Sequence, residues 1–114
     1  MQDSAFMDAL TTASPKIQRA VDQLRYGIAR SLGIDLKNFQ VILVLVSEHL
    51  LAFEYESGIY LNCMPLIGAS DRDMKNSIFF SLLHELVHRA HINHDSSFAD
   101  EYGKLVYHCS ACLN

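Results

Sequence analysis

The histidines of this chain are concentrated in one short segment, and their spacing restricts how that segment can fold. Four of the six histidines fall between residues 84 and 94, and His84, Glu85 and His88 form the pattern HExxH. Residues four apart in a helix lie one turn from each other on the same face, so the pattern predicts a helix whose two imidazoles reach one ion. Neutral imidazole is a zinc ligand, bound at about 2.0–2.1 Å, and two histidines leave room for a third ligand and a water.

The residues around the motif favour a long helix packed on a hydrophobic core. We expect it to run from about residue 71 to residue 91, with Ser70 and Asp73 forming a variant of the capping box. Apolar residues fall on the side opposite the motif: Phe79, Leu82, Leu83, Leu86 and Ala90. A docked helix that presents two histidines and a glutamate is costly unless those groups are used, which favours a functional site over an amphipathic surface.

The third ligand is predicted less directly. His91 shares the helix face, but seven residues of helix place it about 10 Å along the axis from His84, too far for one ion. If the helix ends near residue 91 or 92, a turn through Asn93 brings His94 back to the metal, because Asn enters the left-handed region more readily than most residues. We therefore expect His94 as the third ligand. The alternatives are carboxylates: Asp95, Asp100 and Glu101.

The segment from His84 to Phe98 resembles the zinc signature of the WLM and SprT-like metallopeptidases. Those families show HELxH, a third histidine after a short turn, and a Phe or Trp about four residues later, as this segment does. The resemblance implies a minimal zincin, in which a small sheet packs on the zinc helix and an edge strand lies beside the substrate cleft. It also implies that His84, His88 and His94 hold zinc, that Glu85 is the catalytic acid/base, and that Phe98 packs under the third ligand.

The order of the expected elements indicates an α+β fold in a single domain, residues 1–114. Outside the motif we expect helices in three places: 3–11, from Ser14 and Pro15 to Gly33, and after Ser96 or Ser97. We expect strands in three segments: 39–46, 51–56 and 59–62. The core stripe of the first long helix recurs at helical spacing: Ile17, Val21, Leu24 and Ile28.

Composition and charge exclude several classes of protein. Half of the residues are apolar, 19% are charged and the formal net charge is −4, which is typical of a folded globule without a strongly basic footprint. Arg19, Arg25 and Arg30 are expected on the solvated face of the first long helix. The longest apolar run, 41–46, is far shorter than the ~20 residues of a membrane span.

These features predict where the protein works and with what. Asp3 and Asp8 stand where a signal peptide has positive charge, so we expect a cytoplasmic protein with no membrane partner. The expected partner is a protein or peptide substrate. Nucleic acid enters as a partner through the family resemblance alone, because DNA-linked proteolysis is known in those families.

The C-terminal segment 107–114 carries a second candidate site. Cys109 and Cys112 look like the first half of the zinc ribbon that often follows SprT-like domains, with His108 as a further candidate ligand. A zinc-knuckle remnant is favoured over an unstructured tail and a redox CxxC. Unless it binds metal, we expect this segment to add little burial, so that deletion of 108–114 leaves the fold and the zinc content nearly unchanged. The odd number of cysteines argues against a disulfide framework, and Cys63 is expected to be a small buried hydrophobe.

Two function classes remain open. The first is a zinc-dependent metallopeptidase, in which Glu85 takes a proton from the water that attacks a carbonyl carbon and gives it to the leaving amine. The second is a non-catalytic zinc-binding protein-interaction module, which has no need of Glu85. Asp95 and Asp100 are expected to accept imidazole N–H groups, and strand 59–62, if it is an exposed edge, is expected to bind an extended peptide. Four residues are candidate donors to an oxyanion: Tyr60, His91, Tyr102 and Tyr107.

Overall fold

The computed structural model describes residues 4–45, 52–55 and 58–113 of the chain. The helices are α1 (Ser4–Leu32), α2 (Asp71–His88) and α3 (Ser96–Cys109), and the strands are β1 (Gln40–Val44), β2 (Ala52–Tyr55) and β3 (Gly58–Asn62). Short 3-10 helices occur at η1 (Leu36–Asn38), η2 (Met64–Leu66) and η3 (Ser110–Leu113). This combination of helices and a small sheet confirms the α+β class. The predicted strand ends at 46, 51 and 56 lie outside the described residues.

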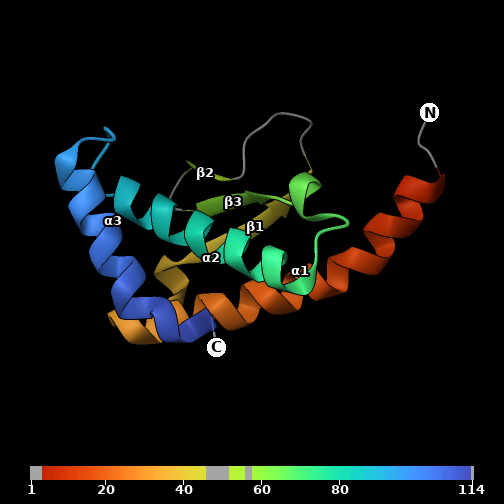
Figure 1. The fold of residues 1–114 in the computed structure, drawn as a ribbon, viewed down its shortest axis with the longest axis horizontal. Coiled ribbons are helices and arrows are strands. Elements are labelled where there is room, and N and C mark those ends of the chain that lie inside the picture. The colour runs from red at the N-terminus through yellow and green to blue at the C-terminus, as the bar shows by residue number, and fades with distance from the viewer. Residues whose placement is uncertain (1–3, 46–51, 56–57, 114) are drawn as a thin grey trace.

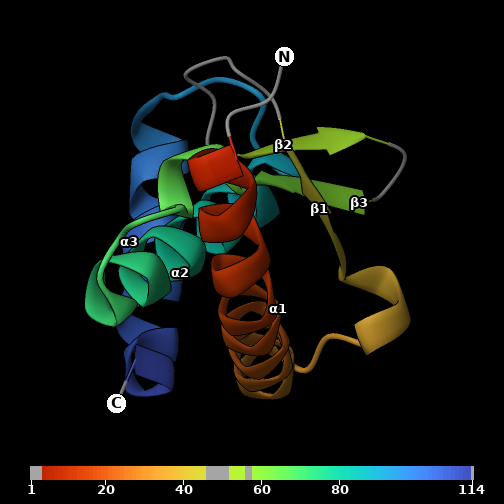
Figure 2. The same ribbon diagram turned by 90° about the vertical axis from the view of Figure 1, so that its right-hand side faces the viewer.

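The elements stack in layers, as Figures 1 and 2 show from two sides. The sheet forms one layer, α1 and α2 cover one of its faces, and α3 packs on α2 on the side away from the sheet. The C-terminal end of α2 therefore lies beside the start of α3, which brings the HExxH motif and the residues that follow it together. None of the described helices combines the length and the apolar character that crossing a bilayer requires.

The central strand of the sheet is β3, because the strand order is β1-β3-β2. It pairs in parallel with β1 and antiparallel with β2. The condition set for peptide binding at 59–62, an exposed edge, is therefore not met, since both sides of this strand are already paired, and Ile59 and Leu61 are at most 1% exposed. The alternation within a strand predicts which face is buried but not which strands lie beside it. The edges of the described sheet are β1 and β2.

One helix of 29 residues replaces the two helices expected at 3–11 and from Ser14. Pro15 lies inside α1 rather than at its start. Proline removes the backbone hydrogen bond to the carbonyl four residues earlier, here that of Thr11, and because both residues are exposed water can replace the missing partner. Gly33 ends α1 as expected: its φ is +69°, and Ile34 N donates to Ala29 O at 2.9 Å, the bonding of a Schellman cap.

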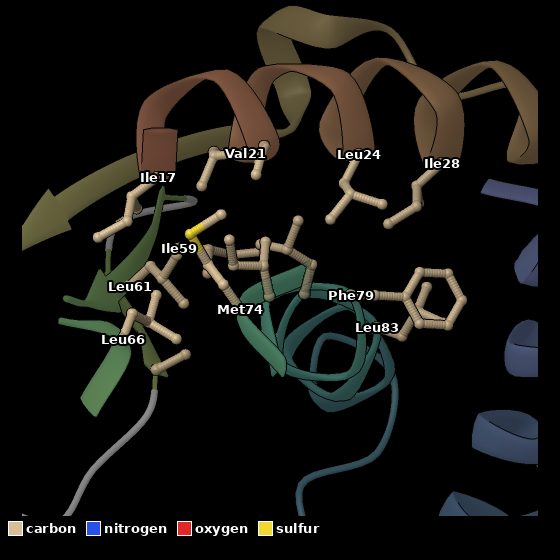
Figure 3. Close-up of a cluster of buried hydrophobic side chains, with 14 of the residues drawn as sticks. Ile17, Val21, Leu24, Ile28, Ile59, Leu61, Leu66, Met74, Phe79 and Leu83 are labelled. Carbon is tan, nitrogen blue, oxygen red and sulfur yellow. The ribbon is translucent and has the colours of Figure 1, made fainter. Parts of the chain in front are cut away.

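A hydrophobic core fills the space between α1, α2 and the sheet (Figure 3). The predicted stripe of α1 is confirmed, because each of its residues is at most 2% exposed: Ile17, Val21, Leu24 and Ile28. The facing side chains come from β3 and α2: Ile59, Leu61, Met74, Phe79 and Leu83. Burying a side chain of this size contributes roughly 1.5–3 kcal/mol, so the apolar face of α2 is held firmly in place.

Both α2 and α3 begin with a side-chain cap, and the second cap differs from the expectation. Ser70 Oγ accepts from Asp73 N at 3.1 Å, as predicted. The cap of α3 is Asp95 and not Ser96 or Ser97, since Asp95 Oδ1 accepts from Phe98 N at 3.0 Å. Because α2 ends at His88, earlier than expected, residues 89–94 form a connecting turn.

The arginines of α1 do not share one environment. Arg19 and Arg30 are exposed, as expected, but the placement of Arg25 on the solvated face is wrong, because it is half-buried. Its Nη2 donates to Leu36 O at 2.7 Å and its Nε donates to Phe39 O. Arg25 thus binds two carbonyls of the segment that connects α1 to β1.

The C-terminal segment is packed into the fold. Cys109 is 0% exposed and belongs to the core. His108 Nε2 donates to Ser31 O at 2.9 Å, and Cys112 Sγ occupies the space next to Gly27. The expectation that this segment adds little burial is therefore wrong, and its deletion would expose part of the core. Cys109 continues the spacing of the apolar residues of α3: Phe98, Tyr102 and Leu105.

Candidate metal centre

The last turns of α2 hold the motif residues at one end of the helix. His84 and His88 are half-buried, and their ring centroids are 4.6 Å apart. Glu85 is 7% exposed, and its Oε1 lies 3.5 Å from His84 Nδ1. Because the opposite face of α2 is buried in the core, the backbone that carries these three side chains is fixed before any ligand binds.

The turn after α2 returns His94 to the motif. His94 Nε2 lies 3.1 Å from His84 Nε2 and 2.9 Å from His88 Nε2. Within residues 4–45, 52–55 and 58–113, these side chains form the one group of three metal-ligating residues, with ligand atoms within 4.8 Å of one another. His94 is exposed, so the group opens to solvent. The rival carboxylates lie outside this group: Asp95, Asp100 and Glu101.

The donor set fits a metal ion better than it fits a hydrogen-bonded cluster. Tetrahedral zinc with bonds of about 2.0–2.1 Å separates its ligand nitrogens by about 3.3–3.4 Å, close to the distances found here. Without a cation, His94 Nε2 faces two other nitrogens, although a neutral imidazole nitrogen carries either one N–H or one lone pair. A cation accepts all three lone pairs at once. The three histidines could therefore hold a metal ion.

A backbone carbonyl orients one of these imidazoles. His88 Nδ1 donates to His91 O at 3.1 Å, which leaves the Nε2 lone pair directed into the cluster. The expectation that Asp95 accepts an imidazole N–H is wrong: its Oδ1 accepts from Phe98 N, and the hydrogen-bond contacts of the three imidazoles go to one another and to His91 O. Asp100 is exposed on α3. Sequence reasoning missed the role of His91 O, since a backbone carbonyl leaves no signature in the residue types.

The ring of Phe98 packs against all three imidazoles. Phe98 is 6% exposed, and its ring centroid lies 5.1 Å from that of His84, 4.8 Å from that of His88 and 4.7 Å from that of His94. Tyr102 stacks on Phe98, with centroids 6.0 Å apart and an interplanar angle of 14°. The family resemblance implied contact with the third histidine alone. The ring instead limits the movement of every imidazole in the group.

Of the four candidate oxyanion donors, Tyr102 lies beside the cluster. Its ring centroid is 6.1 Å from that of His84, its hydroxyl donates to Phe80 O at 3.4 Å, and burial raises its pKa. Tyr107 is 85% exposed. Tyr60 alternates with Ile59 and Leu61 along β3, so its side chain leaves the sheet on the face away from the core. His91 is half-buried in the turn and contributes its carbonyl.

The C-terminal cysteines do not form a metal site with the described side chains. No described histidine, cysteine or carboxylate completes a group of three with Cys109 and Cys112. Burial raises the pKa of Cys109 to about 11, with a further contribution from Cys112. Cys63 is 6% exposed, as expected for a small buried hydrophobe, and burial raises its pKa.

Comparison of the chain with known protein families, with curated proteins and with solved structures finds no match. The likeness to the WLM and SprT-like families therefore stays a prediction from the residues of the motif. What bears on function is the geometry of the three histidines and of the buried glutamate next to them.

Proposed function

We propose that this protein is a zinc-dependent metallopeptidase of the minimal zincin type. His84, His88 and His94 would hold the ion through Nε2, and Glu85 would act as the general acid/base. The observation that carries the proposal is the convergence of three imidazole nitrogens within 4.8 Å beside a carboxylate that is 7% exposed. Zinc is the favoured ion because three imidazoles with an open fourth position are a common catalytic zinc site.

The reaction follows from what each residue can do. Zinc held by three imidazoles supplies a Lewis acid that lowers the pKa of a water to about 7 and polarises a carbonyl. Glu85 is next to a proposed ligand but outside the ligand group, so its carboxylate is free to accept a proton from the attacking water. Glu85 then gives that proton to the nitrogen of the leaving amine. A buried carboxylate is costly to maintain, which supports a chemical role over a surface role.

An extended peptide would bind along β2 rather than β3. β2 contacts α2 and is paired on one side with β3, whereas β3 is paired on both sides. A peptide that adds a strand to the outer edge of β2 would gain main-chain hydrogen bonds next to the helix that carries the cluster. Under this proposal, β2 binds the extended peptide that was expected to bind strand 59–62.

The decisive experiment compares the wild-type protein with Glu85→Gln. We expect about one zinc per chain in both, and hydrolysis of a mixture of unstructured peptides by the wild type alone, because glutamine keeps the size of glutamate but cannot accept the proton. A loss of about 10²–10⁴ in rate is typical of a missing general base. Glu101→Gln, on α3, is the matched control and should keep both zinc and activity.

Three outcomes would contradict the proposal. Hydrolysis by Glu85→Gln at the wild-type rate would remove the proposed base. Retention of zinc by His94→Ala, together with its loss from Glu101→Gln, would overturn the ligand set. Stoichiometric zinc with no hydrolysis of any peptide would favour the non-catalytic zinc-binding interaction module instead.

A further inference from the structure

The position of His94 depends on how the turn that carries it, residues 89–94, is held at its two ends. His94 is exposed, and residues 89–94 form no helix or strand. At the far end, Asp95 caps α3 and fixes where that helix begins. In the middle, His91 O accepts from His88 Nδ1. The near end begins with Arg89, which directly follows the proposed ligand His88, the last residue of α2.

The side chain of Arg89 ties this end of the turn to a distant part of the chain. Arg89 Nη1 donates to Asn38 O at 2.8 Å, across 51 residues of sequence. Asn38 is the last residue of η1, a short helix capped by Asp35, whose Oδ1 accepts from Lys37 N at 3.1 Å. The acceptor carbonyl therefore belongs to a well-defined turn, and the donor is a charged guanidinium, which makes the stronger kind of hydrogen bond.

We propose that Arg89 is a positioning residue for the metal centre. By holding the start of the turn against η1, it fixes the path along which the chain returns, so that His94 Nε2 meets His84 Nε2 and His88 Nε2 before an ion binds. A ligand that is already in place does not lose conformational freedom on binding, so the tie raises metal affinity without contact between Arg89 and the ion. The inference rests on the proposed metal site and adds a residue that the HExxH pattern does not contain.

Arg25 provides a matched comparison within the same fold. It donates to Leu36 O and Phe39 O, so both arginines bind carbonyls of the segment 36–39. Arg25 belongs to α1, however, and no proposed ligand lies on α1 or next to Arg25 in the chain. Loss of either side chain removes hydrogen bonds to the same segment, but only the loss of Arg89 removes the contact between that segment and the turn that carries His94.

The test measures zinc affinity and metal-free stability separately in the full chain. Zinc affinity is determined by competition with a chromophoric chelator, and thermal unfolding is followed in the presence of excess chelator. We expect Arg89→Ala to bind zinc about tenfold more weakly or worse, the range found when groups that orient ligands are removed. Arg25→Ala should lower the melting temperature of the metal-free protein and keep wild-type affinity. If Arg89→Ala does not fold, Arg89→Lys replaces it, with at least a roughly threefold loss of affinity expected.

Wild-type zinc affinity in the folded Arg89 variant would overturn the inference, and so would an equal loss in Arg25→Ala, which would indicate general loosening of the segment 36–39. Either result leaves the peptidase proposal standing if the wild type binds zinc and cleaves peptides. A wild-type protein that binds no zinc would sink both proposals.

Discussion

The contact between Gly27 and Cys112 offers a sharp test of how the C-terminal turn is packed. A Cβ atom at Gly27 would lie 3.0 Å from Cys112 Sγ and 3.6 Å from Cys112 Cβ. Non-bonded heavy atoms are most favourable at about 3.5–4.0 Å, so the sulfur would have to give way by a few tenths of an ångström. Gly27→Ala therefore requires the Cys112 side chain, which belongs to η3, to shift away from α1.

Gly27→Ala makes two contributions to the free energy of unfolding, and they have opposite signs. Alanine in the middle of a helix is favoured over glycine by about 1 kcal/mol, whereas overpacking costs about 1–3 kcal/mol. We expect Gly27→Ala to lower stability by about 0–2 kcal/mol in the wild type. In a Cys112→Ala background the sulfur is gone, and the same change should raise stability by about 1 kcal/mol. The coupling between the two sites is then about 1–3 kcal/mol.

Gly103→Ala is the matched control. Apart from its chain neighbours and the backbone of its own helix, a Cβ atom at Gly103, inside α3, would have no described atom within 4 Å, so this change should stabilise both backgrounds by about 1 kcal/mol. Urea unfolding followed by circular dichroism, with reductant and chelator present, gives all four values of the cycle. If Gly27→Ala stabilises the wild type as much as Gly103→Ala does, Cys112 does not fill this space and the described packing of the C-terminal turn is wrong.

Two further predictions concern α3: the first concerns Cys109 at its C-terminal end, and the second concerns Phe98 near its start. The pKa of Cys109 is about 11 in the folded protein and ordinarily 9.0, so between these values the folded state keeps a proton that the unfolded chain has lost. The free energy of unfolding should therefore fall as pH rises from about 9 to 11. Urea unfolding across this range measures the fall, which Cys109→Ala should reduce. Phe98→Leu should weaken zinc binding about tenfold by chelator competition, whereas Leu105→Ala, farther along α3, should lower stability and leave zinc affinity unchanged.

The parts of the fold that follow from local spacing were predictable from the sequence. The stripe from Ile17 to Ile28 and the helical placement of His84 and His88 depend on residues three and four apart, and both agree with the structure. The return of His94 could also be anticipated, because the alternative ligand His91 is too far along the helix axis. In each case the deciding contact lies within a few turns of the chain.

The parts of the fold that the sequence did not predict depend on contacts between distant segments of the chain. The central position of β3 is set by its pairing with β1, 18 residues earlier in register, as Gln40 pairs with Gly58. The half-buried Arg25 follows from carbonyls of Leu36 and Phe39 that only the folded backbone brings within reach. Pro15 was a misleading signal, because proline is favoured at a helix start and costs about 3 kcal/mol inside a helix, yet it lies inside α1.

The three imidazoles all come from one stretch of chain, residues 84–94, and this affects the unfolded protein as well as the folded one. Bringing the ends of so short a loop together costs little entropy, so under the proposed function the denatured chain would also chelate zinc with the same side chains. If the proposed site binds zinc, the ion would stabilise the fold only by the difference between its affinities for the native and denatured states. The increase in melting temperature on adding zinc should therefore be smaller than the native affinity alone would give. That difference in affinity comes from groups outside the chelating loop, such as the Asn38 carbonyl and the Phe98 ring, which only folding brings to the histidines.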